Sequence, residues 1–162
     1  MNDDLIAVAT ELGHLLIEKK LTITTAESCT SGWVGTALAA VSKSSLFYSS
    51  GFITYTNLAK HRVLNVSMAT LDRYTAVSEA AVSEMACGAK ALSGDTISIA
   101  TSGYAGPDGG EDGTPPGTVW FAWCLPEGCV HTSRQWFSGE SEEVMHKATH
   151  YCLTELKRIL EG

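Results

Sequence analysis

The chain has 162 residues, of which 44% are hydrophobic and 18% charged, a composition typical of a globular domain rather than a disordered segment. Its formal net charge of −7, without a basic cluster, argues against a general nucleic-acid-binding protein, whose affinity comes largely from neutralising phosphates. No apolar run approaches the roughly 20 residues that a membrane span needs, and the acidic, amphipathic N-terminus is not typical of a signal peptide.

The cysteines indicate a reducing environment. There are five of them, an odd number, and no two form a C-x-x-C pair. Reduced thiols in a cytoplasmic protein are the simplest interpretation. We therefore expect a cytoplasmic protein with no membrane and no nucleic-acid partner. The cysteines are Cys29, Cys87, Cys124, Cys129 and Cys152.

The first half of the chain alternates helix and strand patterns. Apolar residues at helical spacing, β-branched runs and small-residue runs define these elements. In chain order they are a helix from Leu5 to the Lys19–Lys20 pair, a strand over 21–26, a helix over 32–41, a strand over 47–56 and a short helix over 57–66.

The second half begins with helices, continues with strands that include a hairpin, and closes with a helix. Ser67 and Ser78 each resemble an N-cap of a following helix. The stretch 96–106 starts as a strand and ends in glycines, and 107–117 is a long loop. The remaining elements are two strands over 118–125 and 129–137 joined by a tight turn, and a closing amphipathic helix that contains Val144, Ala148, Tyr151, Cys152, Leu156 and Ile159. This order predicts a mixed sheet flanked by helices.

The stretch TTAESCTSGW, residues 24–33, places a serine directly after a strand pattern and before a helix pattern. The Ser28 hydroxyl would then lie near the free backbone N–H groups that begin a helix, and such groups stabilise an oxyanion or bind a phosphate. Capping and turn chemistry explain the same pattern. The stretch contains neither the G-x-S-x-G turn nor a P-loop. The residues of this stretch alone do not decide whether Ser28 is a nucleophile or a helix cap.

Cys29 is a rival nucleophile beside Ser28. Consecutive strand residues face opposite sides, so only one of the two side chains can face a given site. A reactive thiol needs a lowered pKa, and no partner that would lower it stands nearby in the sequence. We expect Cys29 to be buried and inert.

A serine nucleophile needs a base, and the histidines offer a weak choice. None of the five occupies a loop of the kind that usually presents a catalytic base. His146 and His150 stand four residues apart, one turn after Glu142, but without the H-E-x-x-H pattern a solvated helix surface explains them better than a metal site.

Lysine is the other possible base, because a desolvated lysine can accept a proton. Lys60, in YTNLAK, follows a strand end and lies one turn into the short helix. Tyr55 and Asn57 would project from the same junction. Spacing alone nevertheless favours Lys60 as a surface charge.

The glycine-rich segment TSGYAGPDGGEDG, residues 101–113, follows a strand. Such density of glycine suits close approach of the backbone to a ligand, and it also suits a flexible solvent loop. Its carboxylates are awkward beside a phosphate and would face ribose hydroxyls, a cation or solvent. They are Asp108, Glu111 and Asp112.

Three motifs in this order, TTAESCTSG, GFITYTNLAK and ATSGYAGPDGG…PPGTVWFAW, resemble the C-terminal domain of the CinA (competence/damage-inducible) family, the nicotinamide-nucleotide amidohydrolases. The resemblance spans roughly residues 5 to 160. It implies a single domain over residues 1–162, a three-layer α/β/α sandwich with a mixed β-sheet. It also implies hydrolysis of the carboxamide of nicotinamide mononucleotide to nicotinic acid mononucleotide and ammonia, with no metal and no cofactor.

The resemblance assigns roles residue by residue. Ser28 matches the nucleophile, Lys60 the general base and Tyr55 its helper. The residues that would line the nucleotide site are Thr30, Ser31, Gly32, Asn57, Thr101, Gly103, Gly106, Gly109 and Gly110.

Several positions depart from the family patterns. Ser31 replaces a glycine of C-T-G-G, Ser102 and Tyr104 replace other residues of the T-G-I-A-G-P segment, and Thr114 replaces a lysine. A lysine there would offer a phosphate a charge-assisted bond. Two alternatives stay open: an amidase for a different substrate, for example one without a phosphate, and a non-catalytic relative that binds a nucleotide or a partner.

Self-association is also expected. The strand VWFAWCL carries Trp120, Phe121 and Trp123, more aromatic surface than one side of a small sheet needs. Burial of these rings under the domain's own helices is the alternative.

Overall fold

The computed structural model describes residues 1–162 as one α/β unit. Every helix and strand predicted above is present, with ends shifted by a few residues. In chain order the elements are α1 (Asp3–Lys19), β1 (Ile23–Glu27), α2 (Trp33–Ala39), a 3-10 turn (Ser44–Leu46), β2 (Tyr48–Ile53), α3 (Asn57–Leu64), α4 (Met68–Tyr74), α5 (Glu79–Ser93), β3 (Ile97–Gly103), β4 (Thr118–Cys124), β5 (Val130–Trp136) and α6 (Ser141–Glu161).

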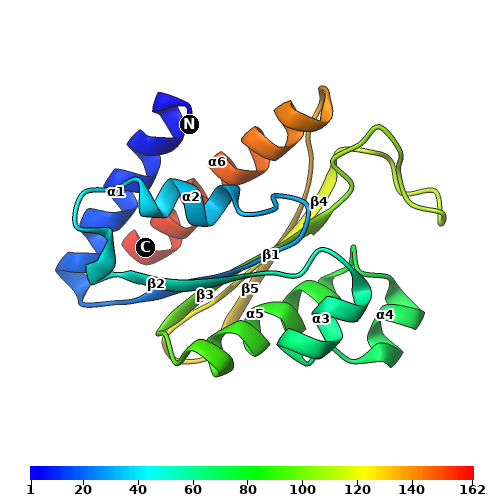
Figure 1. Ribbon diagram of the computed structural model, residues 1–162, viewed down its shortest axis with the longest axis horizontal. Coiled ribbons are helices and arrows are strands. Elements are labelled where there is room, and N and C mark those ends of the chain that lie inside the picture. The colour runs from blue at the N-terminus through cyan, green and yellow to red at the C-terminus, as the bar shows by residue number, and fades with distance from the viewer.

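The five strands form a single mixed sheet in the order β2-β1-β3-β4-β5. β1 is parallel to both β2 and β3, whereas β4 is antiparallel to β3 and to β5. Helices α1, α2 and α6 cover one face of the sheet, and α3, α4 and α5 cover the other (Figure 1). The predicted three-layer α/β/α sandwich is confirmed.

The aromatic residues of β4 belong mostly to the core. Phe121 and Trp123 are fully buried beneath α6, where both contact Tyr151, and the Trp123 indole donates a hydrogen bond to the Cys152 carbonyl at 3.0 Å. Trp120 packs partly buried on the other face. Their burial removes the argument for self-association drawn from this strand, and an oligomer stays a prediction.

Side-chain caps fix the starts of several helices. The Ser67 and Ser78 hydroxyls accept hydrogen bonds from Thr70 N and Ala81 N, confirming both predicted caps. Glu140 and Glu143 form a reciprocal capping box at the start of α6. None of the helices combines the length and the apolar character needed to cross a membrane.

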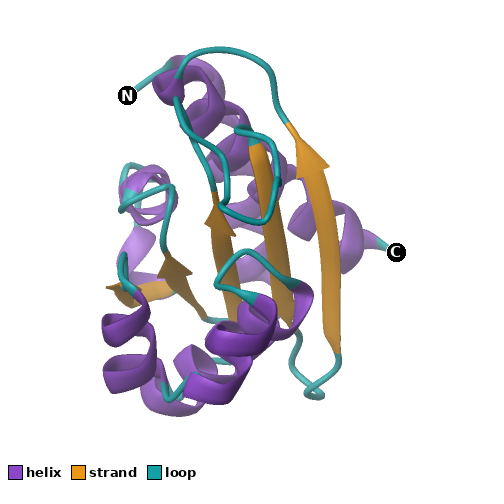
Figure 2. Cartoon of the chain, turned by 90° about the vertical axis from the view of Figure 1, so that its right-hand side faces the viewer, coloured by secondary structure: helices purple, strands orange, loops and turns teal.

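The carboxyl ends of β1, β2 and β3 meet at one edge of the sheet, because these three strands are parallel. The long loop that joins β3 to β4 starts at the same edge (Figure 2). In open α/β sheets ligands bind outside the carboxyl ends of the strands. This edge is therefore where the sequence-predicted motifs meet.

Candidate active site

Ser28 and Lys60 form a hydrogen-bonded pair at this edge. Ser28 directly follows β1, and Lys60 lies in the first turns of α3, which follows β2. The Lys60 Nζ stands 2.9 Å from the Ser28 Oγ. Because β1 and β2 are adjacent parallel strands, residues 32 positions apart in the chain come into direct contact.

Lys60 is buried, with only 1% of its surface exposed, so the interpretation as a surface charge, favoured by spacing alone, is wrong. The helix that carries it is short and half of its residues are polar, so its residue spacing did not indicate which face packs inward. Burial disfavours the ammonium form and lowers the pKa of Lys60 from 10.5 to about 8. A substantial fraction of this side chain is therefore neutral near physiological pH.

Two main-chain carbonyls hold the Lys60 amine. Its Nζ lies 2.9 Å from the Thr54 oxygen and 3.1 Å from the Tyr55 oxygen, in addition to Ser28. A neutral amine has two hydrogens and one lone pair. When both hydrogens bind these carbonyls, the lone pair faces the Ser28 hydroxyl. The geometry thus suits a lysine that accepts the serine proton.

The turn that presents Ser28 is built from main-chain hydrogen bonds. Ser28 N donates to the Thr101 carbonyl of β3 at 3.1 Å, and Ser31 N donates back to the Ser28 carbonyl at 3.0 Å. Ser31 has φ +43° and Gly32 has φ +98°, which turns the chain sharply from β1 into α2. Ser31 occupies the strained position where the family motif has glycine.

Glu27, for which the sequence predicted no role, is central to this turn. Its buried carboxylate accepts hydrogen bonds from the Thr30 hydroxyl and from the amides of Gly32, Val34 and Gly35. It satisfies the first N–H groups of α2 and places a negative charge at the positive end of the helix. An acidic residue within an otherwise apolar and hydroxylic strand was the available signal.

The Glu27 contacts correct one expectation. The N–H groups at the start of α2 were expected to serve an oxyanion or a phosphate. Those of Gly32, Val34 and Gly35 bind Glu27 instead. The amides of Cys29 and Thr30, in the turn before the helix, donate to no main-chain oxygen.

Cys29 points into the core on the face covered by α1, α2 and α6, as predicted. Burial, followed by the nearby Glu27 charge, raises the pKa of its thiol to about 12. Cys29 is therefore protonated at neutral pH and a poor nucleophile. Ser28 is the side chain of this turn that contacts the lysine.

A cavity of about 520 Å³ opens in front of the Ser28–Lys60 pair. Its walls come from the turn after β1, the β2–α3 junction, α4, the α4–α5 connection and the loop after β3. The lining residues are Ser28, Cys29, Tyr55, Asn57, Lys60, Leu71, Thr75, Ala76, Val77, Ser102, Gly103, Tyr104, Ala105, Gly106, Asp108, Gly109, Gly110, Glu111 and Asp112. A pocket with a few convergent polar groups is the usual form of a ligand site.

The predicted nucleotide-site residues divide into two groups. Asn57 and the four glycines at 103, 106, 109 and 110 line the cavity. Thr30, Ser31, Gly32 and Thr101 do not. The Thr30 and Thr101 hydroxyls are fully buried and bind each other at 2.9 Å, and Ser31 is exposed. These outlying residues contact the turn rather than the cavity.

Tyr55 contributes its main chain to the Ser28–Lys60 pair and its side chain to the cavity wall. Its carbonyl accepts from Lys60 and lies 3.4 Å from the Ser28 hydroxyl. The side chain is 67% exposed. A role for its phenol as helper of the base stays a prediction. The α4–α5 segment of the wall, with Thr75 to Val77, was not among the predicted site residues.

The histidines lie away from this cavity. His146 on α6 binds Asp4 at 2.8 Å and Asn2 at 3.1 Å, which accounts for both ring nitrogens. No group of three or more His, Cys, Asp or Glu side chains is arranged to hold a metal ion. The pair His146 and His150 thus belongs to a helix surface.

The fold and the site together define an open α/β protein with a buried Ser–Lys pair in a cavity at the carboxyl ends of its parallel strands. The chain belongs to the CinA family: residues 5–160 match the model of the CinA C-terminal domain.

Relatives and solved structures agree with this assignment. The chain is 44% identical to Protein YdeJ of Escherichia coli K12, covering 98% of this chain and 91% of that protein. It is 41% identical to the nicotinamide-nucleotide amidohydrolase PncC of the same strain, covering 96% and 94%. The crystal structure of competence damage-inducible protein A from Klebsiella pneumoniae superimposes with a TM-score of 0.95 at 46% identity, covering 97% of each chain.

Proposed function

We propose that this protein is an amidohydrolase that converts nicotinamide mononucleotide and water to nicotinic acid mononucleotide and ammonia, with Ser28 as nucleophile and Lys60 as base. The observation that carries the proposal is the 2.9 Å contact between the Ser28 hydroxyl and a buried lysine whose pKa is near 8. The name of the 41% identical PncC relative supports the choice of substrate.

The first half of the reaction transfers the acyl group to the protein. Lys60 takes the Ser28 proton while the serine oxygen forms a bond to the carboxamide carbon. The tetrahedral intermediate then breaks its C–N bond, and the leaving nitrogen takes the proton from Lys60 to depart as ammonia. An ester between Ser28 and the nicotinoyl group remains.

The second half hydrolyses this ester. Lys60, neutral again, takes a proton from a water molecule that attacks the ester carbon. The C–O bond to Ser28 breaks, the serine oxygen regains the proton from Lys60, and the carboxylic acid product leaves. The two carbonyls that hold the amine, Thr54 and Tyr55, keep its lone pair directed at the reacting oxygen in both halves.

The negative charge of each tetrahedral intermediate needs donors. The amides of Cys29 and Thr30 follow the nucleophile directly and donate to no main-chain oxygen, and we assign this role to them. Loss of one such donor in other hydrolases costs about 3–4 kcal/mol of transition-state stabilisation. Glu27 contributes indirectly, by holding the helix start that fixes the turn.

The test is ammonia release from nicotinamide mononucleotide by the purified chain. We expect turnover that falls by at least about 10³-fold in Ser28→Ala. Ser42→Ala, at an exposed serine in the turn after α2, is the matched control and keeps wild-type turnover. Absence of ammonia from the wild type, or full turnover by a correctly folded Ser28→Ala protein, would contradict the proposal.

A further inference from the structure

The cavity carries an excess of negative charge. Among its lining residues Lys60 is the only lysine, arginine or histidine, whereas Asp108, Glu111 and Asp112 all contribute carboxylates. Lys60 lies at the floor, holds two carbonyls and Ser28, and is partly neutral. No cation in the wall is therefore available to bind a phosphate.

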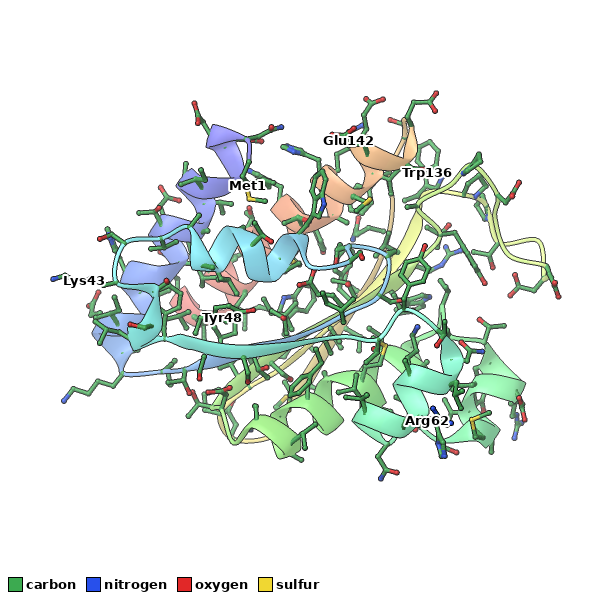
Figure 3. The ribbon with its side chains drawn as sticks, viewed as in Figure 1. Met1, Lys43, Tyr48, Arg62, Trp136 and Glu142 are labelled. Carbon is green, nitrogen blue, oxygen red and sulfur yellow. The ribbon has the colours of Figure 1, made fainter.

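The remaining basic residues lie elsewhere. Lys43 is at the opposite end of the molecule from the loop after β3, and Arg62 lies on the outer side of α3 (Figure 3). Arg73, on α4, stacks over the Tyr74 ring. Neither Arg73 nor Tyr74 lines the cavity. Thr114, where the family pattern has a lysine, is also outside the lining.

The loop that joins β3 to β4, which carries Asp108, Glu111 and Asp112, has a defined conformation. Gly110 N donates to the Thr114 carbonyl, and Gly117 N donates to the Tyr104 carbonyl, so the segment is closed on itself. The Tyr104 ring lies so close to Gly110 that a Cβ there would stand 2.8 Å from its hydroxyl. A hydrogen bond from Thr114 lowers the pKa of Asp112, which keeps this carboxylate ionised. The three carboxylates are thus exposed to solvent at the rim of the cavity, on a loop whose main chain is held by hydrogen bonds.

We infer that this cavity selects by charge: it binds and deamidates the phosphate-free nucleoside, nicotinamide riboside, in preference to nicotinamide mononucleotide. The inference rests on the proposed amidohydrolase function for its reaction, and Asp108, Glu111 and Asp112 are the specificity-determining residues. Tyr104 supplies an aromatic wall that complements a cationic ring.

The two substrates differ in the charge that meets these carboxylates. The pyridinium ring gives the nucleoside a net charge of about +1. A phosphate monoester adds about −1.5 to −2 at pH 7, which makes the nucleotide a net anion. Like charges brought together on binding repel each other, whereas a cation is attracted, and because the carboxylates are exposed both effects weaken as salt is added. The carboxylates attract the pyridinium ring of both substrates, and they repel the phosphate that only the nucleotide carries.

The binding test uses the Ser28→Ala protein, which holds either ligand without turnover. Titration calorimetry gives the dissociation constants of nicotinamide riboside and nicotinamide mononucleotide. We expect the nucleoside to bind at least about tenfold more tightly at low salt, with the ratio shrinking as ionic strength rises.

The charge test adds Asp108→Asn together with Glu111→Gln to the same protein. Asp112 stays unchanged, because its carboxylate binds Thr114 N within the loop. We expect the ratio to move about tenfold toward the nucleotide. The matched control, Glu18→Gln with Glu127→Gln, changes net charge equally at exposed positions at the opposite edge of the sheet and leaves the ratio unchanged.

Ammonia release by the wild type from both substrates separates the two proposals. Release with a larger kcat/KM for the nucleoside supports both. If neither substrate releases ammonia but the nucleoside binds selectively, the amidohydrolase function fails and the charge selection holds. Equal or tighter binding of the nucleotide, binding of neither ligand, or an equal shift in the control pair overturns the charge selection.

Discussion

The two sides of the cavity are built in opposite ways. On the side of β1 and β2, Ser28, Lys60 and Glu27 are buried and bound by several hydrogen bonds each. On the side of the loop after β3, the acidic residues are exposed and a few main-chain bonds set the conformation.

The difference suggests that the buried side carries out the reaction and that the loop side selects the substrate. A reacting pair must be held within a few tenths of an ångström, which buried elements achieve, whereas loops adapt to different ligands. In this protein the departures from the family patterns at Tyr104 and Thr114 fall in the loop region, while Ser28, Tyr55 and Lys60 are retained. Substitutions on the two sides of the cavity test whether the buried side alone determines the rate.

The largest effect is expected at Lys60. Replacement by Met removes the base, and we expect kcat/KM for deamidation to fall by about 10³-fold. Lys60→Arg does not restore activity, because a guanidinium stays protonated at all accessible pH values. Lys43→Met, at an exposed lysine at the opposite end of the molecule, is the control. Activity in Lys60→Met within tenfold of wild type would exclude the base role.

A smaller effect is expected at Glu27. Glu27→Gln exchanges a carboxylate that accepts four hydrogen bonds for an amide with one acceptor oxygen. We expect the free energy of unfolding to fall by about 2–3 kcal/mol. We also expect kcat to fall at least about tenfold at unchanged KM, because the turn that presents Ser28 loosens while the cavity wall is intact.

Glu84→Gln is the matched control for Glu27. Glu84 also caps a helix start, accepting from Ser67 N and the Thr70 hydroxyl, but it lies outside the cavity lining. We expect it to lose stability and keep kcat. A Glu27→Gln protein that loses only stability in the same way would show that Glu27 has no positioning role.

The pH profile should report the buried lysine. The base must be neutral, and the pKa of Lys60 is about 8, so kcat/KM should rise about tenfold per unit below pH 8 and level off above it. The same lowered pKa means that the unfolded chain binds the proton more tightly. The Lys60 contribution to stability therefore increases with pH between about 8 and 10.5. A flat rate profile between pH 6.5 and about 9 would contradict the assignment.

The smallest effect is expected at Tyr55. Its main chain holds Lys60 and its side chain is mostly exposed, so Tyr55→Phe should change kcat/KM by less than about threefold. A loss greater than about 100-fold would instead establish the phenol as a proton-transfer partner. Steady-state deamidation kinetics at pH 8 distinguish the two results.

The sequence predicted the order and type of the elements, because hydrophobic periodicity reports which face of each element is buried. It also predicted the inward Cys29, from the alternation of strand residues, and the caps at Ser67 and Ser78. These features depend on neighbours in the chain.

The features that sequence missed depend on contacts between distant segments. Lys60 is buried because β2 places α3 against the turn after β1, which no local pattern contains. The role of Glu27 arises when α2 folds back onto it. The α4–α5 wall of the cavity belongs to the connection from β2 to β3, which passes over β1 because β1 lies between these two strands in the sheet. Family resemblance supplied the Ser28–Lys60 pair because it records such distant contacts indirectly.

The most direct test of the central claim is to look for the acyl group on Ser28. The wild-type protein is mixed with nicotinamide mononucleotide or riboside, quenched in acid during turnover and analysed by intact mass and peptide mapping. The account predicts a nicotinoyl ester on the peptide that contains Ser28. Steady ammonia release with no such ester, and with turnover preserved in Ser28→Ala, would contradict it.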